Sequence, residues 1–86
     1  MANKDDVVEV NIADFIRLKQ AKMCLEEHKE VSIADVKKLI SEETGISVGA
    51  LNNIVSGRYY PNAIAAIKLA KALDTKVECL YHIKSI

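Results

Sequence analysis

The apolar residues of this chain recur mostly three or four positions apart, which is the spacing of one face of an α-helix. No glycine or proline interrupts residues 12–28, so the first predicted helix covers that range. Just before it, the β-branched run VVEVNI at residues 7–12 allows a short strand. The apolar residues that recur at roughly helical spacing in this range are Ile12, Phe15, Ile16, Met23 and Leu25.

Short polar residues and glycines mark the predicted helix ends. Asp14 and Asp35 each follow a polar residue by three positions, where a carboxylate can complete a capping box. Gly45 and Gly57 stand where the second and third helices should stop, and a left-handed glycine commonly follows a helix. The expected N-caps are Asn11, Ser32, Ser47 and Asn62.

The remaining predicted helices each present one apolar side. Five helices with loops of a few residues between them predict a compact all-α bundle. We expect a frayed polar stretch at 1–6 within an N-terminal extension at 1–11, one domain at 12–82, and a tail at 83–86. The expected inner faces are Val36, Leu39 and Ile40 on the second helix, Leu51, Ile54 and Val55 on the third, Ile64, Ile67, Ala70 and Leu73 on the fourth (with Lys68 and Lys71 outside), and Val77 and Leu80 on a short fifth.

Composition adds a constraint on the partners of the chain. A length of 86 residues suits a single domain, and a 50% apolar, 28% charged composition is globular. Twelve basic residues balance twelve acidic ones, so the strongly basic charge of many nucleic-acid-binding domains is absent. The charge is nevertheless segregated, because residues 16–25 and 45–73 hold no acid while residues 26–44 hold six.

Residues 41–57, SEETGISVGALNNIVSG, have the spacing of two short helices that cross at a steep angle. Ser41 is small enough for close contact between the helices, and Gly45 tolerates the positive φ of a tight turn. Leu51 and Ile54 would pin the second helix to the core. Its other side would then stand free, and a helix presented in this way fits the major groove of B-DNA. The free residues are Val48, Gly49, Asn52 and Asn53.

With these residues the chain resembles the Cro/CI (XRE) family of helix-turn-helix repressors over residues ~32–82. Residues 57–61, GRYYP, resemble the family's Gly-basic-x-x-Pro loop, and residues 66–81 resemble its fourth and fifth helices. The spacing to Gly45 favours residues 40–41 over residues 36–37 in the place of the family's Leu-Ala pair. The resemblance implies a five-helix, lambda-repressor-like bundle that acts as a sequence-specific DNA-binding regulator, a repressor of the phage or mobile-element kind.

The resemblance also implies which residues meet double-stranded DNA, the expected partner. The start of the recognition helix 47–56 holds Ser47, Val48 and Gly49, and its exposed side one turn later holds Asn52 and Asn53. The start of the preceding helix, where the family grips phosphate, holds Lys37 and Lys38. The loop that approaches phosphate from the far end holds Arg58, Tyr59 and Tyr60, and one of the two tyrosines is expected to pack under the loop instead.

A second class of function stays open, namely a protein-interaction module that kept the fold and lost DNA reading, such as an anti-repressor or part of an antitoxin. Val48 and Gly49 stand where longer polar side chains read bases in the family, and zero net charge predicts few phosphate contacts. The two interpretations differ in whether the acid-free segments form one face around the recognition helix. An enzyme is not expected, because no catalytic set or phosphate-binding loop emerges.

No cofactor, metal or small-molecule ligand is expected. Cys24 with His28 and Cys79 with His82 have spacings that zinc ligands can have, yet free cysteine is more often a small buried apolar residue. The two cysteines form no secreted disulfide framework, and no signal peptide or membrane span is visible. These features predict a cytoplasmic location without a membrane partner.

Apolar residues at both ends of the chain predict self-association. Tyr81, Ile83 and Ile86 have no inward place in so small a bundle, and the VVEVNI run shares this surplus. A homodimer formed by pairing of the VVEVNI segments, or by tail-to-tail contact, would bury them. The alternative is that the two termini cover each other within a monomer.

Overall fold

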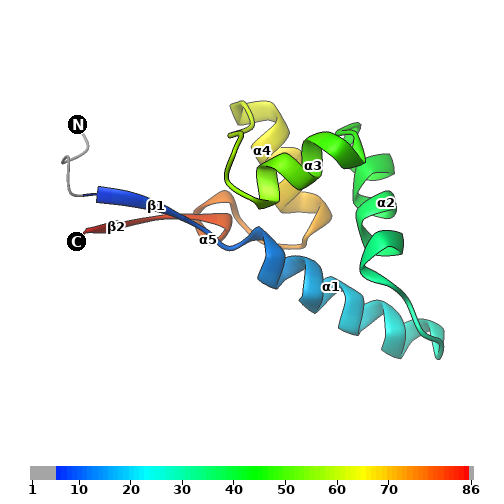
Figure 1. Cartoon of the computed structure of the whole chain (residues 1–86). Helices are drawn as coiled ribbons and strands as arrows, with labels where there is room; N and C mark the ends of the chain where they lie inside the picture. The colour runs from blue at the N-terminus through cyan, green and yellow to red at the C-terminus, as the bar shows by residue number, and fades with distance from the viewer. Residues whose placement is uncertain (1–5, 86) are drawn as a thin grey trace.

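The structure is a computed structural model that describes residues 6–85, over which the chain forms five helices and a two-stranded antiparallel sheet. The helices make one body, and the sheet projects from it on the side away from the second helix (Figure 1). The predicted five-helix bundle with an N-terminal strand is confirmed, and a second strand adds to it. The elements are β1 (Asp6–Val10), α1 (Ile12–Glu27), α2 (Ile33–Thr44), α3 (Val48–Val55), α4 (Ala63–Ala72), α5 (Val77–Leu80) and β2 (Tyr81–Ser85).

Three of the predicted N-caps are confirmed. The Oγ of Ser32 accepts the N–H of Asp35 at 3.1 Å, and the carboxylate of Asp35 accepts the N–H of Ser32 at 3.2 Å, which completes a capping box. Hydrogen bonding of the Asp35 carboxylate to the side chain and to the backbone N–H of Ser32 lowers the pKa of Asp35 below its usual 3.8. Ser47 and Asn62 cap α3 and α4 in the same way, by accepting the backbone N–H three residues on.

Asn11 occupies the N-cap position of α1 as predicted, but the capping box expected with Asp14 does not form. The side chain of Asn11 makes no capping hydrogen bond to α1. Its amide Nδ2 donates instead to the carbonyl of Cys79 at 3.4 Å, and its backbone N–H donates to the carbonyl of Leu80 at 2.9 Å. The reason is tertiary, because Asn11 joins β1 to α1 at the point where α5 comes alongside.

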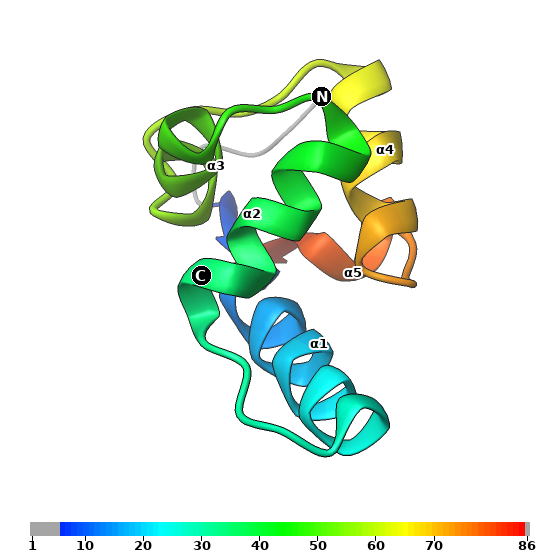
Figure 2. The ribbon, with the colours of Figure 1, turned by 90° about the vertical axis from the view of Figure 1, so that its right-hand side faces the viewer.

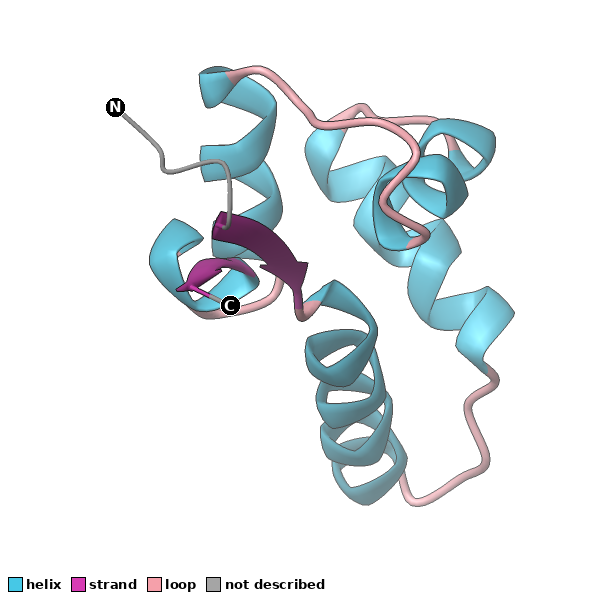
Figure 3. Ribbon diagram, turned by 60° about the vertical axis from the view of Figure 1, so that its left-hand side comes forward, coloured by secondary structure: helices cyan, strands magenta, loops and turns pink. Residues whose placement is uncertain are grey.

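The two ends of the chain pair with each other. β1 and β2 run antiparallel, with Val8 opposite Ile83 and Val10 opposite Tyr81 (Figure 3). The backbones of the two termini therefore pair with each other within one chain, which is the alternative to pairing between two copies. The expected boundary between domain and tail, after residue 82, falls inside β2. Most of the stretch expected to fray (residues 1–5) and Ile86 lie outside the described residues.

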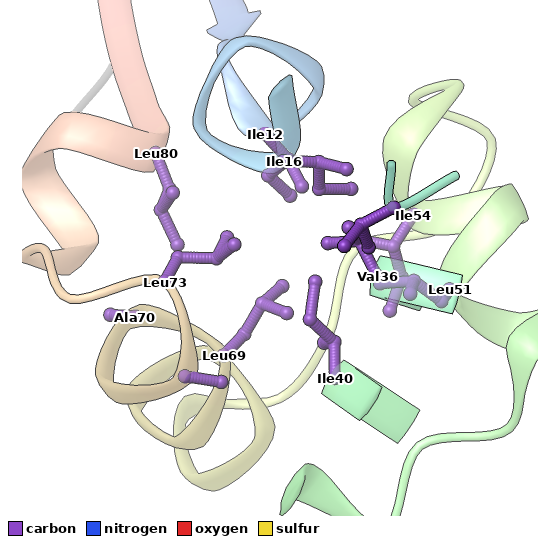
Figure 4. Close-up of a cluster of buried hydrophobic side chains, with 12 residues drawn as sticks. Ile12, Ile16, Val36, Ile40, Leu51, Ile54, Leu69, Ala70, Leu73 and Leu80 are labelled. Carbon is purple, nitrogen blue, oxygen red and sulfur yellow. The ribbon is translucent and has the colours of Figure 1, made fainter. Parts of the chain in front are cut away.

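The core lies between α2 and the helices that surround it. Figure 2 shows α3 on one side of α2 and α4 on the other, with α1 below. Each of these helices contributes fully buried aliphatic side chains that meet in one cluster (Figure 4). Among the described residues, no helix is long and apolar enough to cross a bilayer. The cluster consists of Ile12, Ile16, Val31, Val36, Ile40, Leu51, Ile54, Leu69, Ala70, Ala72, Leu73 and Leu80.

One prediction of inward-facing residues, that of Ile64 and Ile67, is wrong. Leu25 of α1 is also 75% exposed, although its neighbours Met23 and Cys24 pack against the core. Ile64 and Ile67 are 68% and 51% exposed, although Ala70 and Leu73 are buried as expected. The sequence of α4 is apolar on two sides, and the side that packs on the core is the one with Ala66, Leu69, Ala70 and Leu73.

Candidate nucleic-acid interface

The connection between α2 and α3 is fixed by hydrogen bonds inside the turn. Gly45 adopts the predicted left-handed conformation, with φ 77°, and its N–H donates to the carbonyl of Ser41 at 2.8 Å. The buried hydroxyl of Thr44 donates to the carbonyl of Ile40 at 2.7 Å and accepts the N–H of Ile46 at 3.2 Å. The contribution of Thr44 was not predicted. Its signal is a hydroxyl in the last helical turn, which can bond back to the carbonyl four residues earlier.

The turn leaves one side of α3 on the core and the other side in solvent. Leu51 and Ile54 are fully buried against α2 and the rest of the core. The opposite side is exposed over its whole length, as the spacing predicts. Its residues are Val48, Gly49, Asn52 and Asn53, which we call the outer face of α3.

The start of α3 is open to an approaching group. The hydroxyl of Ser47 accepts the N–H of Ala50 at 3.1 Å, which leaves its own O–H as a donor. The first N–H groups of the helix, at Val48 and Gly49, have no acceptor four residues earlier within the helix. No heavy atom lies within 4 Å of the position that a Cβ on Gly49 would occupy, so packing inside the chain does not require this glycine.

Lys37 and Asn52, expected to meet phosphate and a base respectively, lie side by side. The Nζ of Lys37 donates to the Oδ1 of Asn52 at 2.9 Å, which links α2 to the outer face of α3. An oxygen held in this way leaves the amide Nδ2 of Asn52 pointing elsewhere, and the oxygen keeps a second lone pair. The neighbouring Lys38 is exposed.

Arg17 is a basic residue at this site that was not singled out. It lines a hollow of about 230 Å³ together with Lys37 and Val55, so it lies beside α2 and α3. Its signal in the sequence is the acid-free segment 16–25. The other two basic residues of that segment contact acidic side chains, because Lys19 lies 3.6 Å from Glu43 near the end of α2 and Lys22 lies 3.8 Å from Asp74 after α4.

The loop after α3 folds back onto the end of the helix. Gly57 has φ 80°, and the N–H groups of Arg58 and Tyr59 both donate to the carbonyl of Asn53, at 3.0 and 3.3 Å. The side chain of Arg58 is exposed. Tyr59 and Tyr60 are each 54% exposed, but the ring of Tyr60 lies 5.9 Å from the ring of Tyr81 in β2. Tyr60 is therefore the tyrosine that packs on the body of the protein.

The cysteine and histidine pairs do not converge. Cys24 and Cys79 are free thiols, and Cys24 accepts the N–H of Val31 at 3.4 Å in a half-buried position. Over residues 6–85 no group of three His, Cys, Asp or Glu side chains is placed to hold a metal ion.

Comparison with known families singles out the same stretch. Residues 37–78 match the family model described as Helix-turn-helix. The match takes in most of α2, all of α3 and α4, and the start of α5. No curated protein and no solved structure matches the chain.

Gly45 and Gly49 give a matched test of the turn. Neither Gly45 nor Gly49 has a heavy atom within 4 Å of its missing Cβ, so alanine causes no clash at either position. We expect Gly45→Ala to lower the free energy of unfolding by about 1–2 kcal/mol, because its φ is left-handed. Gly49→Ala should raise it by about 0.5–1 kcal/mol, because Gly49 lies within a regular helix. Urea unfolding measures both, and an equal change at the two sites would contradict this account of the turn.

The contact between Lys37 and Asn52 can be tested in the protein without DNA. In Lys37→Met the Oδ1 of Asn52 loses its donor, so the side-chain amide of Asn52 should become mobile, with a clear drop in its ¹⁵N order parameter. The melting temperature should barely change, because the contact is at the surface. Lys38→Met is the control and should leave the amide of Asn52 unchanged; an equal effect would show that the lysine does not orient Asn52.

Proposed function

Since residues 37–78 form a helix-turn-helix domain of the Cro/CI (XRE) family, this chain is a DNA-binding regulator, and we propose that it is a sequence-specific repressor of the phage or mobile-element kind. The observation that carries the proposal is the outer face of α3. It is exposed along its length, begins at a free helix N-terminus, and is flanked by Lys37 and Arg58. A helix presented in this way enters the major groove of B-DNA.

The outer face would read bases through few groups. Val48 would touch the methyl group of thymine, and Asn52 and Asn53 have the amide groups that pair with adenine at N6 and N7. Gly49 lets the backbone come close to the duplex, which explains a helical glycine that packing inside the chain does not need. The hydrogen bond from Lys37 presets the side-chain orientation of Asn52 before DNA is bound.

Phosphate contacts would lie on both sides of the outer face of α3. The N–H groups at the start of α3 and the hydroxyl of Ser47 would meet phosphate at one end. Lys37 and Lys38 would act from α2, and Arg58 with Tyr59 from the loop at the far end. Arg17 joins this set because it lies beside Lys37.

We propose further that the repressor acts as a homodimer on a pseudo-palindromic site. Two copies related by a two-fold axis would place their α3 helices about one DNA turn, roughly 34 Å, apart. Regulation would then follow the concentration of the chain, because dimerisation and DNA binding are linked.

The competing proposal is a protein-interaction module that retains the fold without reading DNA. Its support is that all three basic residues of the acid-free segment 16–25 contact acidic side chains, since Arg17 lies 3.1 Å from Asp14, Lys19 lies 3.6 Å from Glu43 and Lys22 lies 3.8 Å from Asp74. The basic surface around α3 is accordingly small for a DNA-binding domain.

Selection from a pool of random duplex DNA distinguishes the two proposals. A repressor should enrich one pseudo-palindrome with half-sites about one turn apart. The pool bound by an Asn52→Ala, Asn53→Ala double variant should lose base preference within each half-site. Recovery of no sequence motif at low salt would reject the repressor proposal and favour the interaction module.

Arg58 should act on phosphate rather than on a base. Arg58→Ala is expected to weaken binding to all DNA sequences by the same factor. The slope of log K against log salt, roughly −2 to −5 per subunit for the parent protein, should become shallower by about 1. Fluorescence anisotropy on the selected site and on scrambled DNA at several salt concentrations measures both quantities. A loss confined to one base position would instead make Arg58 a base-reading residue.

A further inference from the structure

A hydrogen bond between α2 and the outer face of α3 determines which atoms Asn52 offers to a base. The Nζ of Lys37 lies 2.9 Å from the Oδ1 of Asn52. An ammonium group has only donors, so the oxygen of the amide is the atom that must face it. The Nδ2 of Asn52 is therefore directed away from Lys37, and its two N–H groups remain available as donors.

The position of Lys37 supports this arrangement. Its side chain is half-buried and lines the hollow of about 230 Å³ beside Val55. The ion pairs within residues 6–85 join other side chains, and the nearby Arg17 pairs with Asp14 at 3.1 Å. In this part of the chain no carboxylate therefore competes with Asn52 for the ammonium group of Lys37, and the amide of Asn52 is oriented before DNA arrives.

The purine bases differ in what they present to such a set of donors. Guanine presents two acceptors in the major groove, N7 and O6, whereas adenine presents the acceptor N7 beside the donor N6. An asparagine pairs with adenine when its Nδ2 donates to N7 and its Oδ1 accepts from N6. At Asn52 the N6 amino group would have to share that oxygen with the ammonium group of Lys37, so two donors would crowd one acceptor. The O6 of guanine would meet the same groups as an acceptor.

We propose that Lys37 makes Asn52 a reader of guanine rather than adenine, with Lys37 as the positioning residue. This inference rests on the proposed function and names the base at one position of the DNA site. An ammonium group has three donors, and one of them is engaged by Asn52. The other two can still reach a phosphate or the O6 of the same guanine, so Lys37 keeps its role in phosphate contact and also determines a base.

Asn53 provides a comparison within the same helix. It is exposed like Asn52, but within residues 6–85 its side chain has no hydrogen-bond partner. Both amide groups of Asn53 can therefore turn to fit adenine, with Nδ2 on N7 and Oδ1 on N6. Two neighbouring residues of the same type should thus read different bases, because a lysine holds only one of them.

Selection from random duplex DNA with Asn52→Ala and Asn53→Ala singly locates the two base positions, since each variant should lose preference at its own position. Fluorescence anisotropy then gives dissociation constants for each base pair at the Asn52 position. The parent protein should bind the site with guanine about tenfold more tightly than the site with adenine. Lys37→Met frees the Oδ1 of Asn52, so this ratio should fall to about one or reverse in favour of adenine.

Three controls separate the orientation of Asn52 from the charge of the lysine. Lys38 is exposed on the same helix and is not the partner of Asn52. Lys38→Met should therefore weaken binding to every base pair alike and keep the ratio. Lys37→Arg retains a donor and should retain the preference for guanine. The position read by Asn53 should not respond to Lys37→Met.

The outcomes separate this inference from the proposed function. A pool without any motif would reject the repressor proposal, and the reading of guanine with it. A motif with a base other than guanine at the Asn52 position, or one that Asn52→Ala leaves unchanged, would overturn this inference while the repressor proposal stands. The same holds for a Lys37→Met protein that keeps its preference for guanine, and for a Lys38→Met protein that loses it equally.

Discussion

The left-handed conformation of Gly45 determines how this protein presents its surface. Because that residue turns the chain immediately after α2, Leu51 and Ile54 fall on the core and the outer face of α3 is left in solvent. The hydroxyl of Thr44 reinforces the turn by satisfying one backbone group before it and one after it. A rotation of α3 by one residue, about 100°, would bring polar Asn52 toward the core and expose Leu51. The packing of the core and the free face of α3 therefore depend on the same turn.

The features that could be predicted from sequence are those that neighbouring residues determine. The caps at Ser32, Ser47 and Asn62 and the turn at Gly45 depend on side chains and φ angles within four residues, and all were predicted correctly. The helical periodicity of α2 and α3 identified their buried sides for the same reason. Each of these two helices has one apolar stripe, so the pattern leaves a single choice.

The features that sequence reasoning missed depend on residues far apart in the chain. α4 is apolar on two sides, and only its contact with α2 decides that Leu69 is buried and Ile67 is not. Asparagine is a common N-cap residue, but the side chain of Asn11 bonds instead to the carbonyl of Cys79 in α5. At the candidate site, the contact between Lys37 and Asn52 crosses two helices, and the place of Arg17 requires the packing of α1 beside them.

The pairing of β1 with β2 also governs the order in which the protein folds. Asn11 and Cys79, which join at the base of the sheet, lie 68 positions apart, so this junction closes nearly the whole chain into one loop. The contacts among α2, α3 and α4 span much shorter segments and can form first. The sheet then forms late and, with few buried side chains of its own, is the first part to open. Each such opening releases two short strands that carry apolar residues on one face and unpaired backbone edges. The native state is therefore most exposed to mispairing with other chains where its own two ends meet.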